Sequence, residues 1–289
     1  MIQKTMYKDR PAIAVCGERV RALFLPEDGG KLVSLCFDGR EYLAQREGEV
    51  YRRLRIDSNY VDSECSAFDD MFPTIDPCVI GGCAYLDHGE VARRAWEAEI
   101  GESGVTLFCH LTEIDAVFSK TVTVQEDALC IHYSMQNKTD RTLPYIWAGH
   151  IMLAGETGAW VESPFGTEDA ISVAFGQPIS RERAHILPAK GAIGEYKYYY
   201  DDPHTPMWCA VVYPTGGRVS LDFDNDVVKY LGIWVNPGAL NGMYNLAVEP
   251  CSAPYDDPLR AEAAGKGSYI APGATVEFTL KISYSEDKK

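Results

Sequence analysis

Short runs of alternating apolar and polar residues recur along most of this chain, and turn-forming residues separate them. Such runs occupy residues 12–15, 20–25, 31–37, 105–110, 118–124, 129–135 and 275–280. A period of two is typical of β-strands that bury one face, and the Asp38-Gly39 pair after residues 31–37 favours a tight hairpin turn. The pattern therefore predicts a protein built from many short antiparallel strands.

Sustained helical periodicity is scarce, and no repeat, linker or low-complexity tract divides the 289 residues. We therefore expect an all-β fold, a large antiparallel β-sandwich that forms a single domain over residues 1–289. Residues 46–55 are charged and fit either a short helix or a loop. Residues 59–82 lack a clear period and lead towards His88, so we expect a long ordered loop that lines a site.

The charge of the chain narrows the choice of partners. Its formal net charge is −15, and 46% of its residues are hydrophobic, which is ordinary for a globular protein. A protein this acidic repels nucleic acid and anionic membranes, so we expect neither as a partner. No apolar run approaches the length of a membrane-spanning helix.

The cysteines and the N-terminal residues predict a reducing compartment. The nine cysteines are odd in number and form no CxxC pair, and several of them lie inside apolar runs. Buried, reduced thiols are the simplest interpretation. The first residues lack the apolar core and cleavage site of a signal peptide. We therefore expect a cytoplasmic protein.

Three short stretches carry candidate chemistry. They are Asp87-His88-Gly89-Glu90, Ala148-Gly149-His150 and Val248-Glu249-Pro250, each marked by Gly or Pro. Two imidazoles and a carboxylate can perform acid–base chemistry near neutral pH without a cofactor. The sequence contains no dinucleotide fingerprint, phosphate-binding loop or nucleophile elbow, so we expect no cofactor.

The order of the motifs resembles that of the aldose 1-epimerase (galactose mutarotase-like) superfamily, from about residue 20 to residue 280. The matching motifs, in chain order, are Met71-Phe72-Pro73, Asp87-His88-Gly89-Glu90 followed by Trp96, Met135-Gln136-Asn137, His150, Leu231-Gly232-Ile233-Trp234, Val248-Glu249-Pro250 and Pro272-Gly273. The resemblance implies a β-supersandwich fold. It also implies an isomerase that interconverts the α and β anomers of an aldose by opening and closing the sugar ring.

The resemblance assigns a role to each of the three proton-transfer side chains. Glu249 takes the proton of the anomeric hydroxyl, His150 gives a proton to the ring oxygen, and His88 holds or polarises that region. Sugar faces prefer aromatic walls, for which Phe72, Trp147 and Trp234 are available, with Tyr145 nearby. Arg93, just after the His-Gly motif, is a candidate substrate-binding residue.

Each of these residues also has a plainer interpretation. Glu249 could be a solvated carboxylate at a strand end, His150 a buried core histidine and His88 a turn residue. The three together could bind zinc, although no HExxH-like spacing supports a metal and we expect none. A further sugar-gripping Asp stays open among Asp222, Asp224 and Asp226. A substrate-binding Arg stays open among Arg52, Arg53 and Arg55, and Arg93 and Arg94 could instead be surface charges.

Other functions fit the same scaffold, because a fold does not fix a function. The main alternative is a non-catalytic carbohydrate-binding or sugar-sensing protein. A hexose-6-phosphate mutarotase and a polysaccharide-processing domain are two enzymatic alternatives. The substrate we expect is a small neutral sugar, because the net charge of −15 disfavours a dianionic ligand. The oligomeric state stays open.

Overall fold

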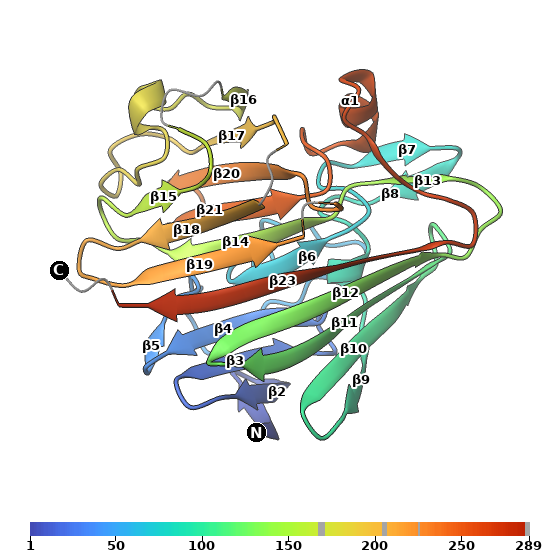
Figure 1. Cartoon of the computed structure of the whole chain (residues 1–289), viewed down its shortest axis with the longest axis horizontal. Coiled ribbons are helices and arrows are strands. Elements are labelled where there is room, and N and C mark those ends of the chain that lie inside the picture. Colours follow the sequence, from blue (N-terminus) through green and yellow to red (C-terminus); the bar gives the residue numbers. More distant parts are fainter. Residues whose placement is uncertain (167–170, 204–206, 225, 287–289) are drawn as a thin grey trace.

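Two large antiparallel β-sheets face each other in this protein (Figure 1). The computed structural model describes residues 1–166, 171–203, 207–224 and 226–286. Within these ranges the only α-helix is α1 (Pro258–Ala263), and the turns η1 (Val91–Arg93) and η2 (Arg181–Arg183) are 3₁₀-helical. No helix in the described part of the chain is both long and apolar enough to cross a membrane. The structure confirms the predicted all-β sandwich.

The first sheet has eleven strands and carries the site described below. Their order across the sheet is β1 (Ile2–Tyr7), β2 (Arg10–Cys16), β3 (Val20–Leu25), β4 (Lys31–Phe37), β6 (Phe68–Met71), β14 (Ala148–Ala154), β21 (Tyr244–Cys251), β20 (Tyr230–Pro237), β17 (Tyr196–Tyr200) and β16 (Ser172–Phe175). The short β5 (Arg40–Glu41) pairs with β4.

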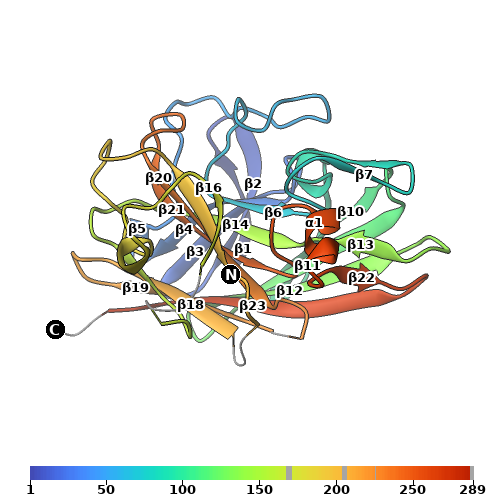
Figure 2. The same ribbon diagram turned by 90° about the horizontal axis from the view of Figure 1, so that it is seen from above.

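The second sheet has eight strands. Their order is β15 (Trp160–Glu162), β18 (Met207–Val212), β19 (Arg218–Phe223), β23 (Thr275–Ser285), β12 (Ala128–Asn137), β11 (Ala116–Gln125), β10 (Gly104–Leu111) and β9 (Glu97–Ile100). Two further sheets have two strands each: the hairpin of β7 (Cys78–Ile80) with β8 (Cys83–Tyr85), and the pair of β13 (Leu143–Tyr145) with the distant β22 (Ser268–Ile270). Helix α1 lies beside the β7–β8 hairpin in both views (Figures 1 and 2).

The alternating runs predicted the strands well. Residues 20–25 and 31–37 form β3 and β4 with those bounds, and the other predicted runs lie inside longer strands. The hairpin predicted at Asp38-Gly39 joins β4 to β5, and both residues have positive φ, 50° and 79°. That conformation suits the twist of a two-residue hairpin, and Gly adopts it without a steric penalty. Residues 46–55 form a loop.

The prediction that residues 59–82 form one long loop was wrong at two places, because this stretch contains β6 and the short β7. Residues Phe68–Met71 form β6, a central strand of the first sheet between β4 and β14. All four of its residues are buried, since loops cover the outer face and the second sheet covers the inner face. Two of the four residues are aspartates, which are depleted in strands, and their buried lysine partners lie far away in the chain. The local sequence therefore gave no strand signal.

The space between the two sheets is the main core. Phe24, Ile151 and Val248 of the first sheet and Phe118 and Leu280 of the second belong to one buried cluster. The strands of both sheets thus turn alternate residues inwards, as the period of two requires.

One ion pair lies within this apolar layer. Lys120 Nζ, on β11, is 2.7 Å from Asp70 Oδ2, on β6, and both side chains are almost completely buried. Trp147 Nε1 donates to the other oxygen of Asp70 at 3.1 Å. The two charges satisfy each other, so removing one of them leaves the other unpaired in a low-dielectric layer.

We therefore predict that Lys120→Met lowers the free energy of unfolding by about 3–5 kcal/mol, because it strands the Asp70 carboxylate. Urea unfolding followed by circular dichroism measures the loss. Lys4→Met, on the exposed face of edge strand β1, is the control and should change stability by less than about 0.5 kcal/mol. Equal stability of the two variants would contradict the prediction.

Candidate active site

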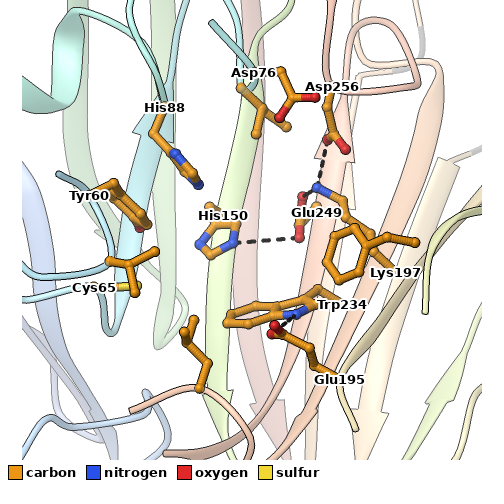
Figure 3. Close-up of a pocket in the computed structure, with 14 residues that line it drawn as sticks. Tyr60, Cys65, Asp76, His88, His150, Glu195, Lys197, Trp234, Glu249 and Asp256 are labelled. Atoms are coloured by element: carbon orange, nitrogen blue, oxygen red, sulfur yellow. Dashed lines mark hydrogen bonds and ion pairs between the residues drawn. The ribbon is translucent and has the colours of Figure 1, made fainter.

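A cavity of about 200 Å³ opens on the outer face of the eleven-stranded sheet (Figure 3). His88, His150 and Glu249 all line it. The other lining residues are Tyr60, Val61, Cys65, Ile75, Asp76, Phe175, Glu195, Lys197, Trp234, Leu240 and Asp256. This volume suits one small polar ligand. The cavity walls combine carboxylates, imidazoles and aromatic rings.

Strand register brings His150 and Glu249 together. Strands β14 and β21 are neighbours and pair Ile151 with Val248, whose side chains point into the inter-sheet core. The residues beside them, His150 before Ile151 and Glu249 after Val248, therefore point to the outer face. His150 Nε2 lies 3.6 Å from Glu249 Oε1, and both side chains are buried.

His88 reaches the same cavity from the turn between β8 and η1. Its backbone has a positive φ of 57°, and its N–H donates to the carbonyl of Ile75 at 2.6 Å. Its ring stacks on Tyr60 with centroids 3.7 Å apart. Its Nδ1 lies 2.9 Å from Asp87 Oδ1, so Nδ1 carries a proton that it donates to Asp87 and Nε2 is directed away from this pair.

Gly89 of the His-Gly motif is required by close packing. Its φ is 77°, and a Cβ atom at this position would lie 2.4 Å from the carbonyl oxygen of Phe72. Any side chain here would push the turn away from Phe72 and move His88 with it. The Gly thus lets the His88 turn rest directly on the chain that follows β6.

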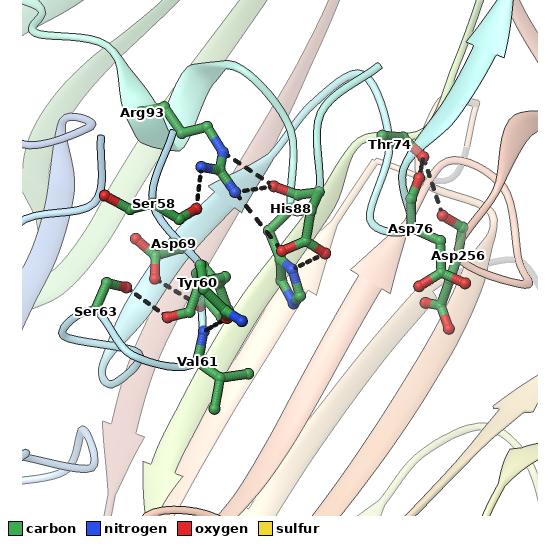
Figure 4. Close-up of polar contacts among 12 residues, drawn as sticks. Ser58, Tyr60, Val61, Ser63, Asp69, Thr74, Asp76, His88, Arg93 and Asp256 are labelled. Carbon is green, nitrogen blue, oxygen red and sulfur yellow. Dashed lines mark hydrogen bonds and ion pairs between the residues drawn. The ribbon is translucent and has the colours of Figure 1, made fainter. Parts of the chain in front are cut away.

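Arg93 does not line the cavity, so its prediction as a substrate-binding residue was wrong. Its guanidinium is almost completely buried and donates to the backbone carbonyls of Arg55, Ser58 and Asp87 at 2.7 Å each. Figure 4 shows Arg93 between Ser58 and the turn of His88. Burial lowers the pKa of Arg93, although the negative charge of Asp87 acts in the other direction. Arg93 instead ties the loop that carries Tyr60 to the turn that carries His88.

Phe72 and Trp147 are not sugar-stacking walls, and these two predictions were also wrong. Both side chains are fully buried in the main core. Phe72 packs against Phe118 with ring centroids 5.4 Å apart, and Trp147 packs against Phe278 at 4.5 Å. Tyr145 belongs to the same core. These rings face the second sheet, on the opposite side of the first sheet from the cavity.

Trp234 is the predicted aromatic residue that does line the cavity. It lies on β20, and its ring stacks beside His150 with centroids 5.5 Å apart. Its Nε1 donates to Glu195 Oε2 at 3.0 Å, which fixes the ring plane. The indole face can therefore cover an apolar face of a sugar ring, as aromatic walls do in such sites.

The sequence analysis missed Lys197 and Asp256. Lys197 lies on β17, where Lys197 pairs with Trp234 of β20, and it is buried beside Glu249. Its Nζ is 2.7 Å from Glu249 Oε2 and 2.7 Å from Asp256 Oδ1. A single lysine in the tyrosine-rich run Glu195–Tyr200 was a usable signal, because a charge in an apolar strand needs a buried partner. The polar loop that contains Asp256 offered none.

A second buried network supports His88 from the other side. Lys31 Nζ on β4 is 2.6 Å from Asp69 Oδ2 on β6, and Tyr60 donates to the same oxygen at 2.8 Å. Because Tyr60 stacks on His88, this ion pair fixes the surface on which the imidazole rests (Figure 4). Lys31 and Asp69 were likewise not predicted.

The residues left open by the sequence lie outside the cavity. Asp222 belongs to β19 of the second sheet, and Asp224 follows it; both are exposed. Arg52, Arg53 and Arg55 are exposed as well, with Arg53 paired to Asp28. Asp226 is exposed, and Arg94 pairs with Glu90. None of these side chains is among those that line the cavity.

The surroundings shift the pKa values of His150 and Glu249 in opposite directions. Burial lowers the pKa of His150 well below its ordinary value, and the charges of Lys197, His88 and Lys31 lower it further. Burial raises the pKa of Glu249, although Lys197 opposes this shift. His150 is thus a neutral ring near pH 7, and Glu249 is a stronger base than a solvated glutamate.

Two polar atoms of residues that line the cavity lack hydrogen-bond partners. Glu249 Oε1 and His150 Nδ1 are buried and have no hydrogen-bond partner. Buried polar atoms without partners are costly and rare in proteins, so each such atom needs an explanation. A polar ligand would supply the missing partners. Within the described ranges no group of three or more His, Cys, Asp or Glu side chains is arranged to hold a metal ion.

Comparison with known proteins finds relatives by structure alone. No family model matches the sequence, and no curated protein matches it. Among solved structures, a protein from Klebsiella pneumoniae provisionally described as an aldose 1-epimerase is 14% identical with a TM-score of 0.75, over 99% of this chain and 83% of that one. A galactose mutarotase-like protein from Lactobacillus casei is 16% identical with a TM-score of 0.68, over 95% of this chain and 100% of that one.

The chain has the galactose mutarotase-like fold. A third structure with this arrangement, the Slr1438 protein from Synechocystis, is 15% identical with a TM-score of 0.71, over 99% of this chain and 100% of that one. The resemblance seen in the sequence motifs is therefore confirmed at the level of the galactose mutarotase-like fold. Identities this low show the fold and leave the activity to be argued from the site.

The buried neutral His150 predicts a pH dependence of stability. A folded-state pKa below the unfolded value, about 6.5, gives stability that is present above pH 6.5 and lost as pH falls towards the folded pKa. The loss is at most about 1.4 kcal/mol per pH unit. We predict that His150→Asn removes this part of the slope between pH 7 and pH 5.

Urea unfolding at several pH values measures the slope. His110→Asn, an exposed histidine on β10, is the matched control and should keep the slope of the wild-type protein. If His150→Asn also keeps the wild-type slope, then His150 is not held neutral by burial.

Proposed function

We propose that this protein is an aldose 1-epimerase that interconverts the α and β anomers of a free, neutral aldose. The observation that carries the proposal is the pair formed by His150 and Glu249, whose facing atoms lie 3.6 Å apart in the cavity. O1 and O5 of a cyclic aldose are bonded to the same carbon. An acid and a base that act on them must therefore lie close together, as these two groups do.

Ring opening would use each group once. The Glu249 carboxylate takes the proton from the O1 hydroxyl, and protonated His150 gives its proton to O5. The C1–O5 bond breaks as the C1–O1 bond becomes a carbonyl. The aldehyde then rotates about the C1–C2 bond, and the reverse proton transfers close the ring on the other face. One positioned proton-transfer group typically contributes about 10²–10⁴-fold to such a rate.

The pKa shifts favour this transfer. In net terms, ring opening moves one proton from His150 to Glu249 through the sugar. The lowered pKa of His150 makes its imidazolium a stronger acid, and the raised pKa of Glu249 makes its carboxylate a stronger base. Both shifts lower the barrier to ring opening, at the expense of a smaller fraction of enzyme in the reacting protonation state.

The other two predicted residues have supporting roles in this proposal. His88, held by Asp87 and stacked on Tyr60, presents Nε2 as a hydrogen-bonding group for the ring oxygen or a neighbouring hydroxyl. Trp234 covers one sugar face beside His150. Only the aldehyde end of the sugar rotates during the reaction. A cavity with a fixed shape on a rigid sheet is therefore sufficient.

The charges in the cavity support a neutral sugar as the substrate. Four carboxylates line it, those of Asp76, Glu195, Glu249 and Asp256, against one lysine. That lysine already pairs with two of the carboxylates. None of the described arginines lines the cavity, so no bidentate phosphate clamp is present there. Carboxylates accept hydrogen bonds from sugar hydroxyls and repel a phosphate.

We predict that Glu249→Gln and His150→Asn each lower kcat for anomer exchange by about 10²-fold or more, because each removes one of the two proton-transfer groups. NMR exchange spectroscopy or polarimetry on a freshly dissolved aldose measures kcat beside the uncatalysed rate. Glu277→Gln and His110→Asn, which remove the same chemical groups from exposed positions on β23 and β10, should retain wild-type kcat.

Near-normal exchange by folded Glu249→Gln protein would contradict the assignment of the base. Sugar binding without any exchange in the wild-type protein would favour the non-catalytic carbohydrate-binding alternative.

We predict a higher kcat/KM for glucose or galactose than for glucose 6-phosphate at physiological salt, because the cavity has excess negative charge. Arg52 is the informative control position. It lines a separate open hollow together with Arg46 and Lys190, where basic side chains gather. A preference for the phosphate that Arg52→Ala abolishes would contradict the neutral-sugar assignment.

A further inference from the structure

A buried lysine stands between two carboxylates at the wall of the cavity. Lys197, Glu249 and Asp256 are each at most 5% exposed, and the Lys197 Nζ lies 2.7 Å from one oxygen of each carboxylate. Tyr199 also donates its hydroxyl to the Asp256 oxygen that Lys197 contacts. The lysine therefore holds Oε2 of Glu249, while Oε1 lies 3.6 Å from His150 Nε2 and has no hydrogen-bond partner (Figure 3).

Lys197 without Asp256 would make Glu249 a weaker base. A cation within hydrogen-bonding distance stabilises the carboxylate and so weakens it as a proton acceptor. Asp256 changes the balance, because its charge offsets that of Lys197. The Lys197–Asp256 pair is neutral as a unit, so it can orient Glu249 while withdrawing little of its basicity.

We propose that Lys197 and Asp256 act together as positioning residues for the base: Lys197 directs Oε1 of Glu249 into the cavity, and Asp256 offsets the lysine's charge so that Glu249 can still accept a proton. This inference rests on the proposed function. It assigns roles to two residues that do not themselves need to touch the reacting atoms.

The charges around Glu249 agree with this division of roles. Burial raises its pKa, Lys197 lowers it and Asp256 raises it. Asp256 in turn keeps a lowered pKa, since Lys197 and Tyr199 outweigh the effect of its burial, so it remains a carboxylate. The titratable groups that face Glu249 from the surrounding elements are Lys197 and Tyr199 on β17, His150 on β14, Cys251 on β21, His88 in its turn and Asp256 after β21.

The test is a direct titration of Glu249. Carbon-13 NMR of protein labelled at the glutamate carboxyl carbons follows each carboxyl through pH, and the signal missing from Glu249→Gln identifies Glu249. Lys197→Met should raise the apparent pKa of Glu249, because it removes the cation and leaves Asp256 nearby. Asp256→Asn should lower it, because the charge of Lys197 is then unopposed. We expect each shift to be about one pH unit or more.

Lys266→Met is the matched control. Lys266 forms a Lys–Asp pair of the same length, 2.7 Å, with Asp201 and does not line the cavity. Its substitution changes the net charge by the same amount as Lys197→Met but should leave the pKa of Glu249 unchanged. Opposite shifts in the two test variants with none in the control would support the proposal. A merely structural role for the pair would not produce opposite shifts.

The kinetics give an independent check. In anomer exchange, Lys197→Met should lower kcat by about 10–100-fold, since Glu249 loses its orientation. Asp256→Asn should lower kcat by less than about tenfold, since the base is weaker but still held.

Shifts of the same sign, or no shift, in the two folded variants would overturn the proposal. If Lys197→Met does not fold, the isosteric Asp256→Asn decides alone: a Glu249 pKa that does not fall overturns the inference. The titration needs no activity. A wild-type protein that shows no anomer exchange would therefore defeat the proposed function without obscuring the result for the charge pair.

Discussion

The two-residue alternation of the central strands of the eleven-stranded sheet is the constraint on which this structure depends. On β14, β21 and β17, one set of side chains fills the apolar space between the two sheets, and the other set points outwards. The inner set supplies most of the stabilising burial. The outer set is thereby free to carry charges. His150, Glu249 and Lys197 all belong to that outer set, on strands close together in one sheet.

Charges on the outer face would be solvated if the sheet were open, but loops cover them. The loop that carries Tyr60, the turn of His88 and the segment of Asp256 close over the central strands. Burial then makes each charge depend on a partner, and the partners form two linked groups around the cavity. One is Lys31, Asp69 and Tyr60, and the other is Lys197, Glu249, Asp256 and Tyr199. Both groups hold proton-transfer side chains in position with buried ion pairs.

In the proposed function, this arrangement lets side chains that line the cavity perform acid–base chemistry near neutral pH. Desolvation shifts the pKa values of His150 and Glu249 in opposite directions, and Lys197 holds one carboxylate oxygen of Glu249. Four carboxylates line the cavity, and its one lysine already pairs with two of them, so the charge of the lining favours the neutral sugar that we propose as the substrate.

The sequence by itself determined the strands with an alternating pattern, the Asp38-Gly39 hairpin and the set of His88, His150 and Glu249 that the cavity brings together. Alternation and turn residues are local signals, and the order of the motifs predicted the three candidate proton-transfer residues. The tertiary structure alone decided which aromatic rings face the cavity. Trp147 lies three residues from His150, and an odd separation in an extended chain places two side chains on opposite faces.

Strand β6, Lys197 and Asp256 also required the tertiary structure. Strand β6 contains two aspartates, and only the folded chain supplies the buried lysines that pair with them. Lys197 meets Glu249 only because β20 places β17 near β21. Asp256 reaches Lys197 through a turn in which Tyr255 and Asp256 have positive φ. Contacts between residues more than fifty positions apart in sequence depend on sheet order and loop closure, which no local pattern encodes.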